Sequence, residues 1–239
     1  MSESVFPQDR GDLQISFGAK FFDGDEASIL RTPILMEYGI THAWQVELEW
    51  EGYAHRDNHP GSSTQGIGDL RFGSKYAFMN IANSHFDLAL VFEMEFPTGS
   101  VNKGLSDGFL HFEPSVVMAY DIPKFNHSQI FTQVSVDLVH RLKANDNPNE
   151  NEPAAHELTV TPGFFIPFNR FIYTTEFTWQ SNEWNHGGTD TEMYITPGLI
   201  VILPRSWQVG VGVPIGLTED SDNFRVIGRV TFEFNVFGK

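Results

Sequence analysis

Residues 86–96 read FDLALVFEMEF, and the alternation in this stretch decides the fold. Every second residue from Phe86 to Phe96 is large and apolar, whereas the residues between them include Asp87, Glu93 and Glu95. Because side chains on a strand alternate between two faces, one face is apolar throughout and the other carries carboxylates. Strands of soluble proteins usually have about five or six residues. A strand of this length, at about 3.3 Å per residue and a tilt of about 40°, rises about 28 Å, close to the apolar band of an outer-membrane barrel.

Composition limits the classes of protein that the chain can represent. The 239 residues are 41% hydrophobic and include 22 Phe, which indicates a folded protein. The chain has no Cys, so disulfides, thiol catalysis and Cys-ligated zinc are excluded. The net charge of −16 argues against nucleic-acid binding, which requires a basic surface. The longest apolar runs, such as LIVILP at residues 199–204, are far shorter than the ~20 residues of a membrane-spanning helix, so a location in a membrane requires a closed barrel.

The alternation of residues 86–96 recurs along the whole chain. The connections between these segments are alternately long and short, and the short ones contain Gly, Pro or Asn. An even number of strands with short periplasmic turns and long extracellular loops is typical of outer-membrane barrels. We therefore predict an all-β fold, a transmembrane antiparallel up-and-down β-barrel of about 12 strands with both termini on the periplasmic side. We expect residues 1–12 to form an N-terminal periplasmic tail and residues 13–239 to form a single barrel domain. The predicted strands cover residues 13–22, 32–38, 44–53, 69–78, 86–96, 112–120, 130–141, 158–166, 171–180, 192–203, 207–215 and 224–237.

Aromatic residues gather at both ends of the predicted strands. Membrane interfaces select such girdles, although aromatic residues also favour strands in general. The residues that we expect in the two girdles are Tyr38, Trp44, Trp50, Phe86, Phe96, Tyr120, Phe171, Trp179 and Trp207.

If the apolar faces contact lipid, the alternate faces line the lumen, and these faces are mainly acidic. An excess of carboxylates favours the passage of cations. We expect Arg71 and Lys75 to lie between two rows of carboxylates, with Glu47, Glu49, Asp69, Glu93 and Glu95 in one charged network around Arg71. The predicted pore-lining residues are Glu47, Glu49, Glu51, Asp69, Arg71, Lys75, Asp87, Glu93, Glu95, Glu113, Asp121, Asp137, Glu176, Arg225, Arg229 and Glu233.

Three segments resemble a known family. They are GIGDLRFGSKYAF at residues 66–78, FPTGS at residues 96–100 and ITPGLIVILPRSWQVGVGVPIGL at residues 195–217. In these segments the chain is similar to the outer-membrane β-barrel family named for a meta-pathway of phenol degradation. The resemblance runs from about residue 39 to the C-terminus and describes strands and turns. It implies a porin-like, transporter-like barrel of Gram-negative bacteria, and it brings no catalytic residue.

The function that we predict is a channel or transporter of the bacterial outer membrane for the passive passage of small molecules. The family resemblance suggests aromatic or hydrophobic solutes, whereas the ionic lining suggests polar ones. Outer-membrane lipid, lipopolysaccharide and the barrel-assembly machinery are the expected partners, and nucleic acid is not. No Ser lies in a strand position that would bring it to a His, so we expect no enzyme, and we expect no cofactor or metal site. Residues 1–12 lack the apolar core of a signal peptide, which we interpret as a mature or re-engineered N-terminus.

Two alternatives remain open at this stage. Interlocked lumen charges would give a closed structural barrel without transport, because a barrel of about 12 strands lies between filled small barrels and open porins. A soluble lipid-binding barrel would instead turn its apolar faces inward.

Overall fold

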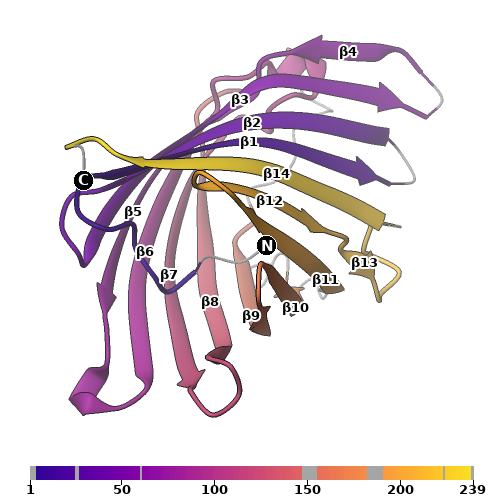
Figure 1. Cartoon of the computed structure of the whole chain (residues 1–239). Coiled ribbons are helices and arrows are strands. Elements are labelled where there is room, and N and C mark those ends of the chain that lie inside the picture. Colours follow the sequence, from indigo (N-terminus) through magenta and orange to yellow (C-terminus); the bar gives the residue numbers. More distant parts are fainter. Residues whose placement is uncertain are drawn as a thin grey trace.

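The computed structural model describes residues 4–24, 27–59, 61–146, 155–181, 191–222 and 224–237. Within these ranges the chain is an all-β protein whose antiparallel strands close into one barrel (Figure 1). β1 pairs with β14 from Asp12 opposite Asn235 to Asp23 opposite Phe224, which closes the wall. The twelve wall strands are β1 (Asp12–Asp23), β2 (Ala27–Gly39), β3 (Trp44–Asn58), β5 (Leu70–Phe78), β6 (Phe86–Phe96), β7 (Phe109–Ile122), β8 (Ser128–Arg141), β9 (Glu157–Phe168), β10 (Phe171–Ser181), β11 (Thr191–Leu203), β12 (Trp207–Gly212) and β14 (Phe224–Asn235).

Four short elements supplement this wall. β4 (Ser63–Gly66) pairs with the far end of β3. β13 (Ile215–Gly216) follows β12 after a break at Val213 and Pro214, and it pairs with β11 and β14. The 3-10 helices η1 (Ile81–Asn83) and η2 (Val101–Lys103) lie at opposite ends of β6. None of the described helices is long and apolar enough to span a membrane.

The predicted barrel is confirmed, and the differences concern the ends of the strands. β2 begins at Ala27 rather than at residue 32, and β7 begins at Phe109 rather than at residue 112. Both extensions lie at the end with the long connections, where the strands continue their pairing. Ile29 and Leu30 are consecutive apolar residues, as are Phe109 and Leu110, so the strict alternation breaks here and could not mark the extensions.

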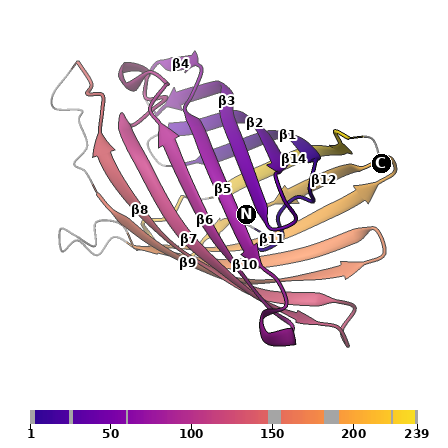
Figure 2. The ribbon, with the colours of Figure 1, turned by 90° about the vertical axis from the view of Figure 1, so that its left-hand side faces the viewer.

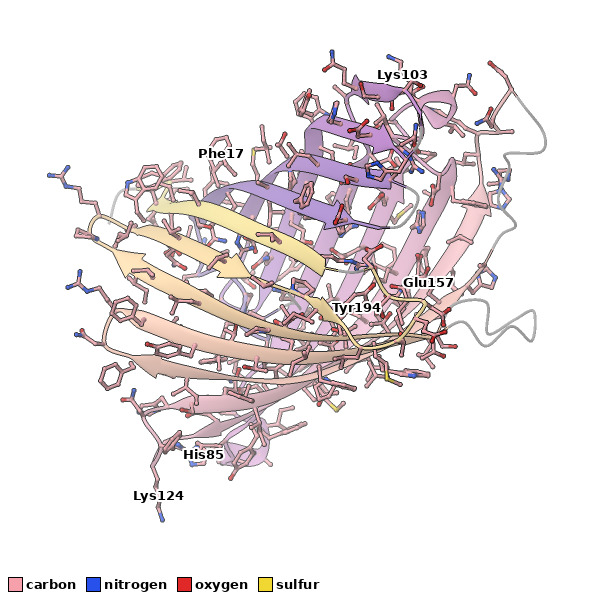
Figure 3. The ribbon with its side chains drawn as sticks, turned by 90° about the vertical axis from the view of Figure 1, so that its right-hand side faces the viewer. Phe17, His85, Lys103, Lys124, Glu157 and Tyr194 are labelled. Carbon is pink, nitrogen blue, oxygen red and sulfur yellow. The ribbon has the colours of Figure 1, made fainter. Side chains whose placement is uncertain are left out.

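The two faces of the wall differ as expected for a protein surrounded by lipid. Large apolar side chains point outward, and Phe17 and Leu90 are 56% and 48% exposed. Figure 3 shows Phe17 on the outer side of the wall. Polar residues such as Gln45 and Lys75 are instead buried on the inner side. This arrangement contradicts the alternative of a soluble lipid-binding barrel, which needs an apolar interior.

The short turns are built from residues with left-handed backbone conformations. Asn126 and His127 both have φ of 53° between β7 and β8, and Arg205 and Ser206 have φ of 63° and 61° between β11 and β12. Two successive positive φ values match the right-handed twist of the flanking strands. Asn tolerates this region better than most residues, which explains its recurrence at these turns.

The N-terminal segment, defined here as residues 4–11, lies inside the barrel (Figure 2). Val5 is only 1% exposed and packs with the small inward residues Ala77, Ala89, Val117 and Ala119. These residues lie near the ends of β5, β6 and β7 that join the short turns, so the segment occupies the periplasmic part of the lumen. The sequence predicted a periplasmic tail over residues 1–12. Its described part is folded into the barrel instead, while the division into tail and barrel domain stays a prediction.

Hydrogen bonds hold the N-terminal segment in place, and a glycine on the wall leaves room for it. The Gln8 backbone N–H donates to Gln45 Oε1 at 2.8 Å, and Gln8 Nε2 donates to Gln14 Oε1 at 3.0 Å. The segment passes so close to Gly39 that a Cβ there would lie 2.0 Å from the Asp9 carbonyl oxygen. Only glycine therefore fits at this position without displacing the segment.

Candidate channel lumen

The predicted pore-lining residues lie in the rows that face away from the exposed aromatics. All of them are on wall strands except Asp69, which precedes β5 by one residue. Their surroundings differ along the barrel axis. At the periplasmic end, Asp87 accepts a hydrogen bond from the Asn80 N–H at 2.7 Å and Asp121 lies 3.3 Å from His127. These two carboxylates therefore support turns, and the role of the whole set as a pore lining stays a prediction.

Arg71 is the centre of the charged interior, and Glu95 and Glu93 are its direct partners. Arg71 Nη2 lies 2.5 Å from Glu95 Oε2, and Nη1 lies 3.8 Å from Glu93 Oε1. Glu49 pairs with Lys20 at 3.0 Å and also interacts electrostatically with Arg71. Asp69 accepts a hydrogen bond from the Gly99 N–H at 2.8 Å. Direct contacts of these carboxylates are thus shared among Arg71, Lys20 and the backbone, and the predicted network as a whole stays a prediction.

Three basic residues that face the interior were not among the predicted pore-lining residues. Lys20 was not assigned to the lumen, although it shares the parity of the inward face. Arg31 binds both carboxylate oxygens of Glu51, at 3.0 and 3.1 Å, and fell in a predicted loop. His111 lies one residue before its predicted strand. Continuing the alternation backward from Glu113 could have found it.

His111 links a loop to the wall. Its Nδ1 lies 2.6 Å from Asp137 Oδ2 on β8, and its Nε2 lies 2.8 Å from Asp107 Oδ2 in the loop before β7. A ring that bridges two carboxylates in this way fixes the position of that loop over the extracellular half of the lumen.

Asp69 and Asp107 lie outside the strands and differ in their acidity. Burial raises the pKa of Asp69 to about 6, against the hydrogen bond from Gly99 that stabilises the charged form. For Asp107, burial acts in the same direction, but the bonds from His111 and from the Phe109 N–H outweigh it and lower the pKa. Asp69 therefore changes charge near neutral pH and Asp107 does not.

Three connected cavities lie inside the barrel. The first, which we call the charge cluster, has a volume of about 330 Å³ and is the most acidic. A second cavity of about 300 Å³ shares Glu113, Asp137 and Glu157 with it and extends to Tyr194 and Arg225. A third, of about 260 Å³, lies between Arg71 and the opposite wall at Gly228 and Arg229. The charge cluster is lined by Arg31, Asp69, Arg71, Glu93, Glu95, Asp107, His111, Glu113, Asp137 and Glu157.

The residues predicted for the girdles lie on the outer surface of the wall at both strand ends. Trp44, Tyr120 and Trp207 are exposed near the short turns, and Trp50 and Phe96 are exposed near the long loops. The other four are half-buried among their neighbours: Tyr38, Phe86, Phe171 and Trp179. Their contact with membrane interfaces stays a prediction. In the part of the chain that the structure describes, no group of three or more potential ligands is arranged to hold a metal ion.

The closed wall of twelve strands, the apolar outer surface and the charged interior define an outer-membrane barrel with the architecture of channels and porins. Residues 3–234 match the family described as "Putative MetA-pathway of phenol degradation", and the chain belongs to this family. The resemblance noted from the sequence is thereby confirmed. A comparison with curated protein sequences gives no match.

Solved structures with the same fold include channels and porins, and also the β domain of the Bordetella autotransporter BrkA, with a TM-score of 0.58 at 11% identity, covering 95% of this chain and 100% of that one. An outer membrane channel from Pseudomonas putida F1 aligns with a TM-score of 0.70 at 12% identity, covering 98% of this chain and 99% of that one. The NanC porin gives a TM-score of 0.59 at 11% identity, covering 92% and 97%. The KdgM porin gives a TM-score of 0.56 at 12% identity, covering 92% of this chain and 99% of the porin. At these identities the likeness establishes the fold alone.

Proposed function

We propose that the protein is a channel of the bacterial outer membrane that passes small molecules passively, without catalysis, and that prefers cations to anions. The apolar outer face, the family and the porin folds of similar structures support this location and function. Outer-membrane lipid and the barrel-assembly machinery are the partners that this proposal requires. The ionic interior supports polar solutes over the hydrophobic or aromatic ones that the family name suggests.

The observation that carries the preference for cations is the charge of the interior. Seven carboxylates line the charge cluster, against Arg31, Arg71 and His111. Several of these carboxylates share one basic partner, so negative charge remains in excess. Water inside a narrow wall of low dielectric screens such a field less than bulk water does. Cations are therefore concentrated at the extracellular entrance of the lumen.

Recordings from single barrels in planar lipid bilayers test this proposal. Under a gradient of potassium chloride, the reversal potential is expected to have the sign of a cation-selective pore. A reversal potential of the opposite sign would contradict the cation preference. A folded barrel that inserts into the bilayer and carries no current would exclude the pore.

A closed structural barrel is the second candidate, and the N-terminal segment favours it. Val5 and the inward alanines fill the periplasmic part of the lumen with apolar atoms. Ions cross such a region poorly, because apolar constrictions tend to lose their water. The two candidates differ in whether a water path remains beside this segment, and the same recordings distinguish them.

The cation preference is expected to depend on pH through Asp69. Because the pKa of this group is about 6, its carboxylate is charged at about pH 7 and protonated at about pH 5. The ratio of cation to anion permeability should therefore fall over this range in the unmodified protein and fall less in Asp69→Asn. Asp57→Asn, at an exposed position of β3, is the control and should keep the full pH dependence. Equal pH dependence in the unmodified protein and in Asp69→Asn would remove Asp69 from this role.

A further inference from the structure

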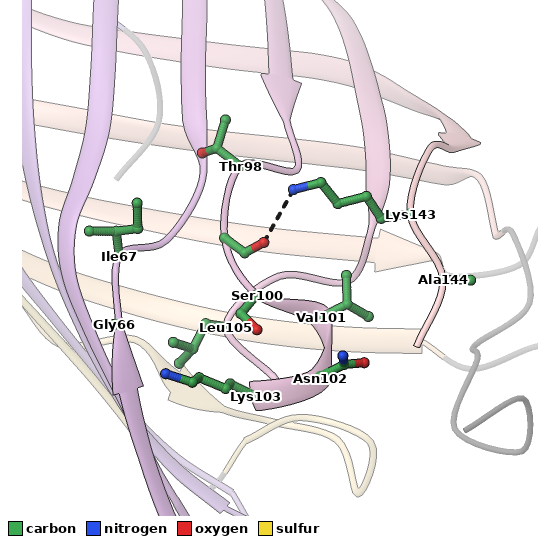
Figure 4. A pocket seen from close by; sticks show the side chains of 11 residues that line it. Gly66, Ile67, Thr98, Ser100, Val101, Asn102, Lys103, Leu105, Lys143 and Ala144 are labelled. Atoms are coloured by element: carbon green, nitrogen blue, oxygen red, sulfur yellow. Dashed lines mark hydrogen bonds between the residues drawn. The ribbon is translucent and has the colours of Figure 1, made fainter. Parts of the chain in front are cut away.

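A fourth cavity, at the extracellular end, lies outside the charge cluster, and we call it the loop pocket (Figure 4). Its volume of about 620 Å³ falls in the range of small-molecule sites. It lies where the long connections before β5, before β7 and after β8 meet. The residues that line it are Gly66, Ile67, Thr98, Gly99, Ser100, Val101, Asn102, Lys103, Leu105, Lys143 and Ala144.

The loop pocket has the opposite charge to the rest of the barrel. No carboxylate lines it, whereas Lys103 and Lys143 do. The neighbouring charge cluster is lined by seven carboxylates, and the whole chain has 31 acidic residues against 15 basic ones. A cavity with two ammonium groups and no acid in such a chain favours an anionic ligand.

Both ammonium groups retain donors for a ligand. Lys103 Nζ donates to the Gln65 carbonyl oxygen at 3.3 Å, and Lys143 Nζ donates to the Gly99 carbonyl oxygen at 3.4 Å. Figure 4 shows the bond of Lys143 at the edge of the pocket. Neither lysine is paired with a carboxylate of the residues that the structure describes. Because an ammonium group has three N–H donors, each lysine can bind an anion while it keeps its long bond to the loop.

The loops around the pocket are held in place by their own contacts. The side chain of Asn102 donates to Asp146 Oδ2 at 2.6 Å, and its oxygen accepts from the Asp146 N–H at 3.0 Å. The Thr64 hydroxyl donates to the Lys103 carbonyl oxygen at 2.7 Å, and Leu105 is buried. A pocket that is preformed in this way loses little entropy when a ligand binds.

We propose that the loop pocket binds the phosphate of a phosphorylated sugar, carried either by lipopolysaccharide or by a free sugar phosphate. Two ammonium groups match the charge of a phosphate, and the hydroxyls of Ser100 and Thr98 match a saccharide. The pocket lies at the extracellular ends of the strands, beyond Phe96, where the headgroups of the outer leaflet are expected. The inference rests on the outer-membrane location proposed above and does not require transport.

Binding to the purified full-length protein in detergent tests this inference with three probes. They are phosphorylated lipopolysaccharide, the same lipopolysaccharide after enzymatic dephosphorylation, and glucose 1-phosphate. The double variant Lys103→Gln/Lys143→Gln is expected to bind phosphorylated lipopolysaccharide about tenfold more weakly than the unmodified protein. Lys103→Arg/Lys143→Arg keeps both charges and should bind nearly as well. Lys124→Gln is the control, since Lys124 is exposed at the opposite, periplasmic end (Figure 3).

The outcomes separate the sources of the phosphate and the two proposals. Competition by glucose 1-phosphate would support a site that accepts a free sugar phosphate, and binding of phosphorylated lipopolysaccharide alone would support the lipid-borne source. The inference is overturned if dephosphorylation has no effect, if the glutamine variant binds as well as the unmodified protein, or if no probe binds. A barrel that conducts ions but binds no probe would refute only this inference. One that binds phosphate but carries no current would refute only the proposed channel.

Discussion

Removal of residues 1–10 is expected to raise the single-channel conductance about threefold or more, because it clears the periplasmic part of the lumen. Val5 is buried among the inward alanines of β5–β7, and Gln8 bonds to Gln14 and Gln45 across the interior. These contacts join the segment to the wall, and none of them is part of the strand pairing that holds the wall together. The truncated chain keeps Gly11, whose N–H donates to the Gly39 carbonyl oxygen and whose own carbonyl accepts from Val236, so β1 stays anchored. Conductance in planar bilayers measures the effect.

A pair of glycine variants tests the same point without shortening the chain. Gly39→Ala places a methyl group against the Asp9 carbonyl oxygen and should displace the segment, so its conductance should rise toward that of the truncated protein. Gly228→Ala is the matched control, because a Cβ at this position meets no atom within 4 Å. If the truncated protein and Gly39→Ala both conduct like the unmodified protein, the N-terminal segment does not control the lumen.

Arg71→Gln should raise the ratio of cation to anion permeability about threefold. Arg71 is the basic partner of Glu95 at 2.5 Å and of Glu93 at 3.8 Å. Its loss leaves both carboxylates facing the lumen without their closest positive charge. The Arg71 side chain is 34% exposed, so water can solvate the remaining carboxylates and the barrel should still fold. Reversal potentials in a salt gradient measure the ratio, and circular dichroism checks the fold.

Arg170→Gln is the control for this prediction, because Arg170 is exposed in the short turn between β9 and β10. It removes the same charge from the chain and should leave the selectivity unchanged. An equal shift in both variants would mean that selectivity follows the net charge of the protein. No shift in Arg71→Gln would place the path of the ions away from Arg71.

The architecture could be predicted from the sequence because a barrel wall obeys a strict local rule. Each strand alternates between lipid and interior, so FDLALVFEMEF reveals both of its faces without knowledge of its neighbours. Turn residues such as Asn126 and Asn169 mark the reversals for an equally local reason, since their backbone tolerates positive φ. The twelve wall strands and the family follow from these signals.

The pairing of charges could not be predicted in the same way. Whether Glu49 binds Arg71 or Lys20 depends on side-chain reach across neighbouring strands, and Lys20 lies 29 positions away in the sequence. The location of the N-terminal segment inside the barrel could not be predicted from the sequence either. Its residues show no alternation, and Val5 becomes apolar core only because distant alanines leave room for it. The loop pocket combines three connections, and no single connection shows the pattern of a binding motif.

The closing register between β1 and β14 also orders the events of assembly. It joins Asp12 to Asn235, which lie 223 positions apart, so the wall cannot close before nearly the whole chain has been made. The N-terminal segment directly precedes β1, so we expect it to lie on the inner side when that seam forms. The segment therefore enters the lumen at the same stage at which the wall closes. A newly made barrel would then enter the membrane with the periplasmic part of its lumen already narrowed, without an interval in which a wide pore leaks.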